Sequence, residues 1–221
     1  MPDPLVLADD VESELVERRS RFLTRLHRVE SPEQAEEHLR SARTAHPDAR
    51  HHCSALVISP GPNRPVVHRS SDDGEPSGTA GMPMLQALLH AELTDTLAIV
   101  TRYFGGVKLG AGGLVRAYTA AVEQAVAAAT LLRRTDLAVV RLEVPHAEVG
   151  IAEHALRLWA QTSGAVVEDT TYGARAATLT VLTDPATIDS LVADVARWST
   201  GRFTPEQDGT RRADVPRDTG A

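Results

Sequence analysis

From Asp136 onward, patterns typical of strands and helices follow one another in an order that few domain folds contain. Extended stretches rich in apolar residues are separated by two segments whose apolar residues recur at helical spacing. In chain order these are strand 137–144, helix 147–162, strands 165–172 and 174–183 with Tyr172-Gly173 at the turn between them, helix 185–200 and strand 201–205. The order β-α-β-β-α-β predicts a ferredoxin-like domain over residues 136–205.

The preceding residues predict a separate α+β domain over residues 11–134, with its longest helix last. Strands are expected at 11–17, 21–29, 52–59, 65–69 and 97–104, and helices at 32–45, 80–91 and 114–132. Ser31 and Thr79 are the expected N-caps of the first two helices, because short hydroxyl side chains accept hydrogen bonds from free N–H groups there. The segment PGPN (60–63) is the expected turn between two of the strands.

The composition indicates a globular protein of a reducing compartment. With 221 residues, of which 42% are hydrophobic, the chain can bury a core in each of two domains. A single cysteine excludes an internal disulfide, no apolar run reaches the length of a membrane span, and the acidic N-terminus lacks the features of a signal peptide. Residues 1–10 and 206–221 are polar and aperiodic, so we expect flexible tails. We expect a cytoplasmic protein without membrane contact, and no pattern specifies an oligomeric state.

Charge is distributed unevenly along the chain. The net charge of −7 argues against a protein that coats nucleic acid through bulk electrostatics. Residues 20–135 nevertheless hold thirteen basic and eleven acidic side chains, whereas residues 1–19 and 136–204 both have an acidic excess. A phosphate-bearing partner is therefore expected at the first domain.

A glycine-rich segment, RYFGGVKLGAGGLVRAY (102–118), joins a predicted strand to a predicted helix. Bare backbone N–H groups at a helix N-terminus, together with basic side chains, can form an anion site. The candidates for binding an anion or a nucleic acid are Arg102, Gly105, Gly106, Lys108, Gly110, Gly112, Gly113 and Arg116. Lys108 is the only lysine among the 23 basic residues, which hints at a specific role. The alternative is that the glycines merely allow a sharp turn and close packing. The segment matches neither the P-loop nor GxGxxG, so it predicts no particular nucleotide.

An acidic turn precedes the second predicted helix. Asp72, Asp73 and Glu75 place three carboxylates around a Gly-Glu-Pro turn, where they could bind a divalent cation or act as acid and base. We favour the alternative that Asp-Gly is turn chemistry and that the carboxylates are solvated or paired with arginines. If this turn lies beside the glycine-rich loop, acids and bases would face each other across one pocket.

The only cysteine, Cys53, lies in the segment ARHHCSALV. On a strand, His51 and Cys53 point to one face and His52 to the other, so the three cannot share one metal ion. No CxxC or HExxH motif occurs that would supply a zinc site. A catalytic thiol would need a histidine base, and we favour a small core residue instead.

Three long motifs, in this order and at this spacing, resemble the YigZ/IMPACT family over roughly residues 10–205. They are RHHCSALV (50–57), SDDGEPSGTAGMPML (71–85) and RYFGGVKLGAGGLVRAY (102–118), extended by SRFL (20–23) and HPDARHHC (46–53). The resemblance implies a first domain with the left-handed βαβ fold seen in a ribosomal protein's second domain, elongation factor G and the GHMP kinases. It implies a second domain like the ferredoxin-like C-terminal domains of elongation factor G.

The resemblance also implies a link to translation. Eukaryotic IMPACT relatives regulate translation initiation during amino-acid starvation by competing for an activator of an initiation-factor kinase. Those relatives carry an additional N-terminal domain, so only the general theme of translation transfers. The family has no agreed catalytic residues. Some relatives are labelled proline dipeptidases, but this sequence contains no set of metal ligands and no nucleophile-base motif that would support that activity.

Three functional hypotheses follow. We favour a non-catalytic protein, without cofactor or metal, that binds RNA, the ribosome or a translation factor through the glycine-rich loop and the open sheet face of the second domain. The first alternative is an enzyme that holds a small phosphorylated or anionic metabolite at the loop, with Asp73 and Glu75 as metal ligands or base. The second is a protein–protein scaffold in which the loop is purely structural. A closed pocket shared by both motifs would indicate an enzyme, whereas an open surface would favour a binder.

Overall fold

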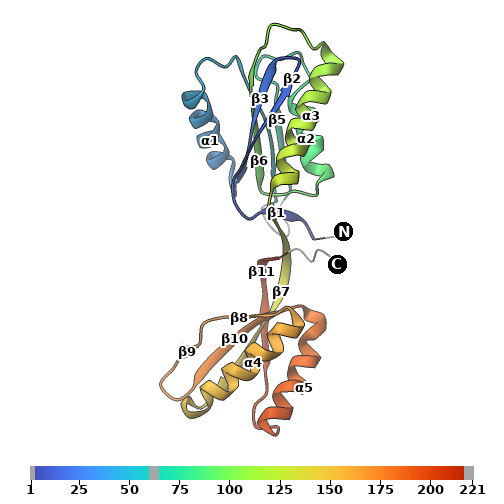
Figure 1. The fold of residues 1–221 in the computed structure, drawn as a ribbon. Helices are drawn as coiled ribbons and strands as arrows, with labels where there is room; N and C mark the ends of the chain where they lie inside the picture. Colours follow the sequence, from blue (N-terminus) through green and yellow to red (C-terminus); the bar gives the residue numbers. More distant parts are fainter. Residues whose placement is uncertain (1–2, 60–64, 217–221) are drawn as a thin grey trace. The chain divides into compact units, whose positions relative to one another are not determined.

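The computed structural model describes residues 3–59 and 65–216 and contains two compact units (Figure 1). The first unit comprises Met1–Arg134 and the chain from Asp214 onward, and the second comprises Thr135–Ala213. Both combine helices with a sheet, which confirms the predicted α+β class. The expected PGPN turn lies outside the described residues. Among the helices described, none has both the length and the apolar character needed to cross a membrane.

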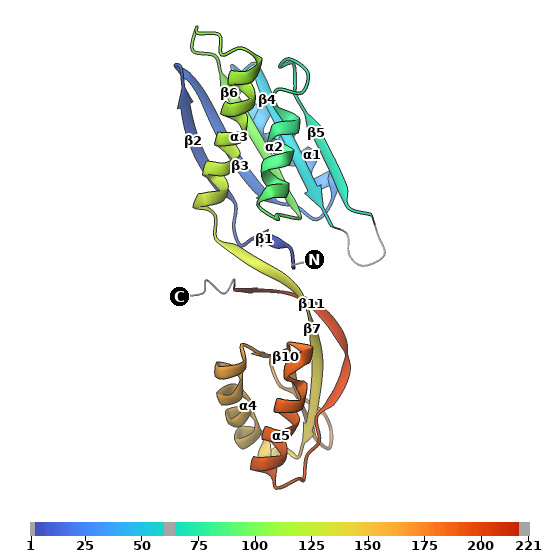
Figure 2. The ribbon, with the colours of Figure 1, turned by 90° about the vertical axis from the view of Figure 1, so that its right-hand side faces the viewer.

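The first unit is built on a five-stranded sheet (Figure 2). Its strands are, in spatial order, β2 (Val11–Glu17), β3 (Ser20–Arg28), β6 (Thr96–Tyr103), β4 (His51–Ile58) and β5 (Val67–Ser71), and all neighbours are antiparallel. The central strand β6 is buried along nearly its whole length, as its continuous apolar start predicts. The five strands overlap the five stretches predicted for this domain.

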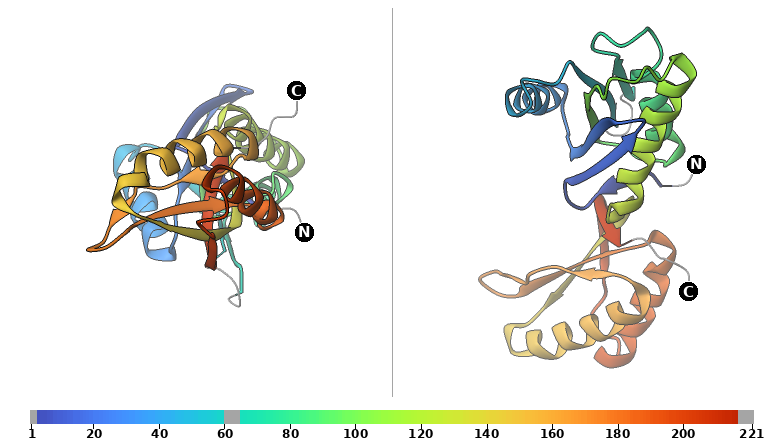
Figure 3. Two further views of the ribbon diagram at one scale, coloured as in Figure 1. Left: turned by 90° about the horizontal axis from the view of Figure 1, so that it is seen from below. Right: turned by 45° about the horizontal axis from the view of Figure 1, so that its top comes forward.

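Helices cover both faces of this sheet, as Figure 3 shows. On one face lie α2 (Gly81–His90) and α3 (Ala111–Ala128), whose apolar side chains pack with Phe22 of β3 and its neighbours. On the other face α1 (Pro32–Ala45) packs over Ile99 and its neighbours. The predicted start of α1 is confirmed, because the side-chain oxygen of Ser31 accepts a hydrogen bond from the first turn.

The second unit follows the predicted order β-α-β-β-α-β, except that two short strands occupy the stretch predicted as its second strand. Its elements are β7 (Leu131–Val144), α4 (Val149–Ser163), β8 (Val166–Val167), β9 (Thr171–Tyr172), β10 (Ala177–Thr183), α5 (Ile188–Ser199) and β11 (Glu206–Pro216), with short 3-10 turns at His146–Glu148 and Pro185–Thr187. Strands β11, β7, β10 and β8 are neighbours in that order, and β9 also pairs with β10. Helices α4 and α5 bury their apolar sides against Leu142 and Leu179 of this sheet.

The expectation of two flexible tails is wrong for two segments. Residues 5–7 form β1, a strand of three buried residues that pairs with the start of β7 in the first unit. Residues 206–216 form β11, so the last strand lies after the 201–205 stretch expected to hold it. β11 consists mainly of polar residues and is held by pairing with β7 and by ion pairs such as Arg141–Asp208 at 2.8 Å. A pattern based on apolar residues cannot detect such a strand.

Two further boundaries differ from the prediction. Helix α3 spans 111–128 rather than 114–132. It begins earlier than predicted, so that Gly112 and Gly113 lie in its first turn, and it ends earlier because the backbone becomes extended at Ala129. The strand expected at 165–172 is divided into β8 and β9. Tyr172 therefore belongs to β9, and the turn after it is closed by the Gly173 N–H donating to a carbonyl at 2.9 Å.

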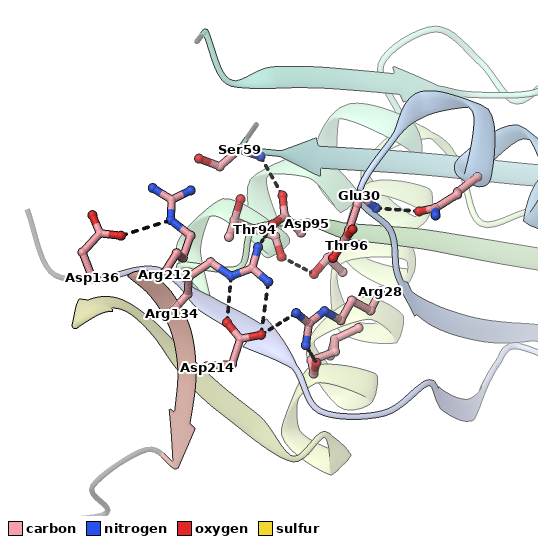
Figure 4. Close-up of polar contacts among 12 residues, drawn as sticks. Arg28, Glu30, Ser59, Thr94, Asp95, Thr96, Arg134, Asp136, Arg212 and Asp214 are labelled. Carbon is pink, nitrogen blue, oxygen red and sulfur yellow. Dashed lines mark hydrogen bonds and ion pairs between the residues drawn. The ribbon is translucent and has the colours of Figure 1, made fainter. Parts of the chain in front are cut away.

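A network of charged side chains within the first unit includes residues from the start of β7 and the end of β11 (Figure 4). The guanidinium of Arg134 donates to Asp95 and also to Asp214, the latter at 2.8 Å, and Arg28 contacts Asp214 as well. The carboxylate of Asp95 in turn accepts the Ser59 N–H at 2.7 Å. The hydrogen bond from Arg134 is the main cause that holds the pKa of Asp214 below its ordinary value. This network explains why the last residues of β11, 214–216, belong to the first unit.

Candidate functional site

The glycine-rich loop (residues 104–110) lies between β6 and α3 at one end of the first sheet (Figure 2). Gly105 is required by packing, because an added Cβ would lie 2.0 Å from the backbone oxygen of Arg19. Gly106 and Gly110 have φ angles of +85° and +71°, which side chains rarely adopt. The turn hypothesis therefore accounts for these three glycines.

The remaining two glycines are less constrained, because only Gly113 is closely approached: an added Cβ there would lie 3.1 Å from Cβ of Leu109. Gly112 and Gly113 lie in the first turn of α3, and an added Cβ on Gly112 would meet nothing closer than the Arg116 side chain at 3.6 Å. The N-cap, Gly110, has no side chain to accept hydrogen bonds from this turn. Lys108 and Arg116 are exposed beside it. Amide groups and two cations are thus presented together to solvent.

Arg102, by contrast, is buried in an ion pair with Glu75. The side chains of Arg102 and Glu75 are 6% and 4% exposed, and Nη1 lies 2.6 Å from Oε1. The Tyr118 hydroxyl donates to the same carboxylate oxygen at 2.9 Å. Nη2 of Arg102 donates to Oγ of Ser20, which also accepts the Gly105 N–H, both at 3.3 Å. The acidic turn and the loop do meet, but these two charges neutralise each other inside the domain, so Arg102 is not presented to an external anion.

Asp72 holds the start of α2. Its carboxylate accepts the N–H groups of Gly78, Ala80 and Gly81 at 2.8, 3.0 and 2.8 Å. Burial alone would raise the pKa of Asp72, but these three hydrogen bonds hold it below its ordinary value. The expectation that Thr79 caps this helix is wrong, because its hydroxyl donates to a carbonyl within the turn. The cap comes from a residue farther back in the chain.

Asp73 serves yet another purpose. It turns the chain at φ +41°, and its carboxylate accepts the His52 N–H at 2.7 Å and the Arg43 guanidinium at 2.9 Å. The carboxylates of the acidic turn therefore have separate sets of donors and do not converge. Within residues 3–59 and 65–216, no group of three or more His, Cys, Asp and Glu side chains is arranged to hold a metal ion.

Cys53 is fully buried between the sheet and the helices of its face. Its thiol donates to the backbone oxygen of Asp72 at 3.0 Å and lies 3.3 Å from the Tyr118 hydroxyl. Burial raises the pKa of the Cys53 thiol to about 12. A nucleophilic cysteine needs a lowered pKa and access to solvent, so this environment favours the core residue over the nucleophile.

We expect Cys53 of the native protein to resist thiol reagents at pH 8. Because the thiolate is both scarce and buried, reaction with Ellman's reagent should require unfolding. The reaction rate should therefore rise with urea concentration in proportion to the fraction of unfolded protein. The urea-unfolded protein, which should react rapidly, is the control. A native reaction as fast as that of free cysteine would contradict the buried placement.

The tip of the β2–β3 hairpin brings two further cations to the loop, and sequence reasoning missed them. Glu17 pairs with Ser20, so Arg18 and Arg19 are the two turn residues. Their φ angles of +45° and +68° lie in the left-handed region, where tight hairpins strongly prefer Asn-Gly. Such conformations cost about 1–3 kcal/mol each and persist only where the surroundings hold them. The sequence feature that could have revealed these cations is a pair of arginines at a predicted hairpin turn, where Asn or Gly is usual.

The hairpin and α3 border one shallow cavity of about 260 Å³. Its lining includes Arg18 and Glu17 from the hairpin, and Gly113 and Arg116 from α3. Both arginines are exposed, and the cavity opens to solvent beside the loop. The acidic turn contributes no lining residue. The rest of the lining is apolar and comprises Leu15, Leu109, Ala117 and Ala120. An open groove edged by two arginines can bind an extended anionic chain, whereas an enzyme site would need both motifs in one wall.

The sequence predicted part of this constellation. Gly112, Gly113, Lys108 and Arg116 lie together as the strand–loop–helix pattern suggested. Arg102 points into the domain, because a partner 27 residues earlier in the chain neutralises it.

Comparison with known proteins places the chain among a set of similar sequences. The family model described as "Impact N-terminal domain" matches residues 18–126. "IMPACT family member YvyE" of Bacillus subtilis is 41% identical over 66% of this chain and 66% of its own length, just under two thirds. "IMPACT family member in pol 5′region" of Thermus thermophilus is 41% identical over 63% of this chain and 73% of its own length. A solved structure of a hypothetical protein is 34% identical and has a TM-score of 0.57, covering 93% of this chain and 97% of that one.

Proposed function

Because this chain belongs to the IMPACT family, we propose that it is a translation-linked, non-catalytic protein that binds RNA, free or within the ribosome, through its glycine-rich loop. The observation that carries the proposal is the exposed turn of glycine amides flanked by Lys108 and Arg116. Phosphate oxygens accept hydrogen bonds from helix N-terminal amides and from basic side chains. The proposal draws its link to translation from the family resemblance.

The acidic turn supports a binding role rather than catalysis. Asp72 caps α2, Asp73 ties the turn to β4, and Glu75 is paired with Arg102. Each carboxylate is therefore occupied in holding the fold, and Cys53 is buried. A general base or nucleophile needs a free functional group beside the substrate.

The second unit contributes less to the proposed contact. Its exposed arginines on β7 and β11 pair with carboxylates, as in Arg141–Asp208 at 2.8 Å and Arg212–Asp136 at 3.4 Å. Paired charges offer little net attraction to phosphate. We therefore assign RNA binding to the first unit alone and do not include the open sheet face of the second.

Replacing Lys108 and Arg116 together with alanine should weaken RNA binding. Loss of two phosphate contacts is expected to lower affinity by about tenfold or more at moderate salt. The affinity is measured by fluorescence anisotropy with a labelled single-stranded RNA. A length of about 20 nucleotides exceeds the usual binding site of one small domain. The control is Arg40→Ala with Arg175→Ala, two exposed arginines that form no ion pair in the described part of the chain.

The outcomes of this experiment separate the hypotheses. Weaker binding in the loop variant but not in the control supports the proposal. Absence of binding by the wild-type protein, or equal binding by both variants, would contradict it. Displacement of the RNA by millimolar inorganic phosphate would instead indicate a site for a small anion, as in the enzyme hypothesis.

A further inference from the structure

We infer that a single strand of RNA is gripped between the β2–β3 hairpin and the glycine-rich loop, with one base stacked on Phe104. The inference rests on the proposed function and names the form of its RNA and the residues that hold it. It assigns Arg18 and Arg19 to phosphate contacts. It also gives the exposed aromatic ring a role in binding.

The hairpin retains arginines where the backbone disfavours them. Both turn residues have positive φ, and an Asn-Gly pair would adopt this conformation with less strain. The Arg18 side chain is 60% exposed and has only a 3.8 Å contact with Glu17. Arg19 is exposed and forms no ion pair within the described residues. Backbone strain combined with an exposed charge that is only weakly paired, as at Arg18, or unpaired, as at Arg19, is expected where a side chain is kept for contact with a partner.

The buried network fixes the hairpin to the loop. The backbone of Gly105 lies directly against Arg19, and its N–H donates to Oγ of Ser20 at 3.3 Å. The same Oγ accepts from Arg102, which is held by Glu75. The backbone segments that carry the cations of the hairpin and Lys108 of the loop are therefore held side by side. A preorganised surface binds with less loss of conformational entropy.

Phe104 provides a platform beside these cations. Its side chain is 48% exposed in a folded domain, and the guanidinium carbon of Arg102 lies over the ring, 5.6 Å from its centre. Val107, also exposed, is in the same loop. Aromatic rings next to a basic groove are the usual means of binding single-stranded nucleic acid, because unpaired bases can stack on them.

Charge favours an RNA partner over a protein partner of mixed charge. The surface carries the four exposed cations Arg18, Arg19, Lys108 and Arg116. Arg18 and Arg116 line the cavity, together with one carboxylate, Glu17. This local excess occurs in a chain whose net charge is −7. Repulsion between the rest of the protein and RNA makes a local, salt-sensitive contact the expected mode of binding.

The test is the double variant Arg18→Asn with Arg19→Gly in the full-length protein. Since it relieves strain, we expect the melting temperature to rise by roughly 2–8 °C. Since it removes two phosphate contacts, we expect the affinity for a uridine-rich single-stranded RNA to fall by about tenfold. Phe104→Ala should lower the affinity for the same RNA by about fivefold or more. The control, Arg40→Asn with Arg175→Asn, removes the same charge from sites outside this surface.

Each outcome bears on the inference. A more stable variant that binds RNA weakly supports it, because misfolding cannot explain the lost affinity. Wild-type affinity in the hairpin variant, with loss in the Lys108 and Arg116 variant, would overturn the inference and leave the proposed function intact. Tighter binding of duplex RNA than of the single strand would overturn the stacking role of Phe104. If wild-type protein bound no RNA, both proposals would fail.

Discussion

Replacing Glu75 with alanine is expected to lower the free energy of unfolding by about 3–5 kcal/mol. The substitution leaves the guanidinium of Arg102 buried without its counter-charge, and it removes the acceptor of the Tyr118 hydroxyl. Arg102 cannot recover its hydration, because the side chain is only 6% exposed. Urea denaturation followed by circular dichroism measures the change, in the same buffer for variant and wild type.

An exposed ion pair provides the matched control for this prediction. Glu14 and Arg21 lie 2.6 Å apart, but their side chains are 40% and 52% exposed. Glu14→Ala should therefore cost less than about 1 kcal/mol. The double variant Glu75→Leu with Arg102→Met should be more stable than Glu75→Ala, because it leaves no unpaired charge inside the domain. Equal small losses for Glu75→Ala and Glu14→Ala would show that the buried pair is not formed.

Replacing Gly105 with alanine is expected to destabilise the protein by about 1–3 kcal/mol and to weaken RNA binding. The new Cβ would lie 2.0 Å from the backbone oxygen of Arg19 and 2.6 Å from its Cβ. Because the obstacle is largely backbone, relief requires the hairpin and the loop to move apart. That movement would separate the cations of the two elements. Thermal unfolding and RNA anisotropy on the same preparation measure both effects.

Gly112→Ala is the control from the same segment. Its added Cβ would meet no atom closer than 3.6 Å, and alanine is favoured over glycine within a helix by roughly 0.5–1 kcal/mol. We expect this variant to be at least as stable as wild type. If both glycine variants behaved alike, the close contact between loop and hairpin would be contradicted.

The sequence predicted those parts of the fold that depend on local patterns. Apolar periodicity located the strands of the first sheet, and Ser31-Pro32 located the start of α1. Apolar periodicity failed for β11, because its residues are mainly polar and its stability comes from pairing with a distant strand. It also failed for the cap of α2, because Asp72 reaches that helix only through the folded turn. Contacts between residues distant in sequence are invisible to periodicity.

The candidate site divides in the same way. Residue types pointed to the glycine amides and to Lys108, which lie together on one short segment. They also suggested Arg102, but the structure pairs it with Glu75. The contribution of Arg18 and Arg19 depends on the exact hairpin register and on positive φ angles. Neither property is readable from composition or motif.

The most direct test of the central claim is the salt dependence of RNA binding by the wild-type protein. Contacts with three or four phosphates predict that the logarithm of the association constant falls linearly with the logarithm of salt concentration, with a slope of about −2 to −3 for a single strand. The Arg18→Asn, Arg19→Gly variant should reduce the steepness of that slope by about 1.4. A slope near zero, or one unchanged by the variant, would contradict the claim that this surface binds the RNA backbone.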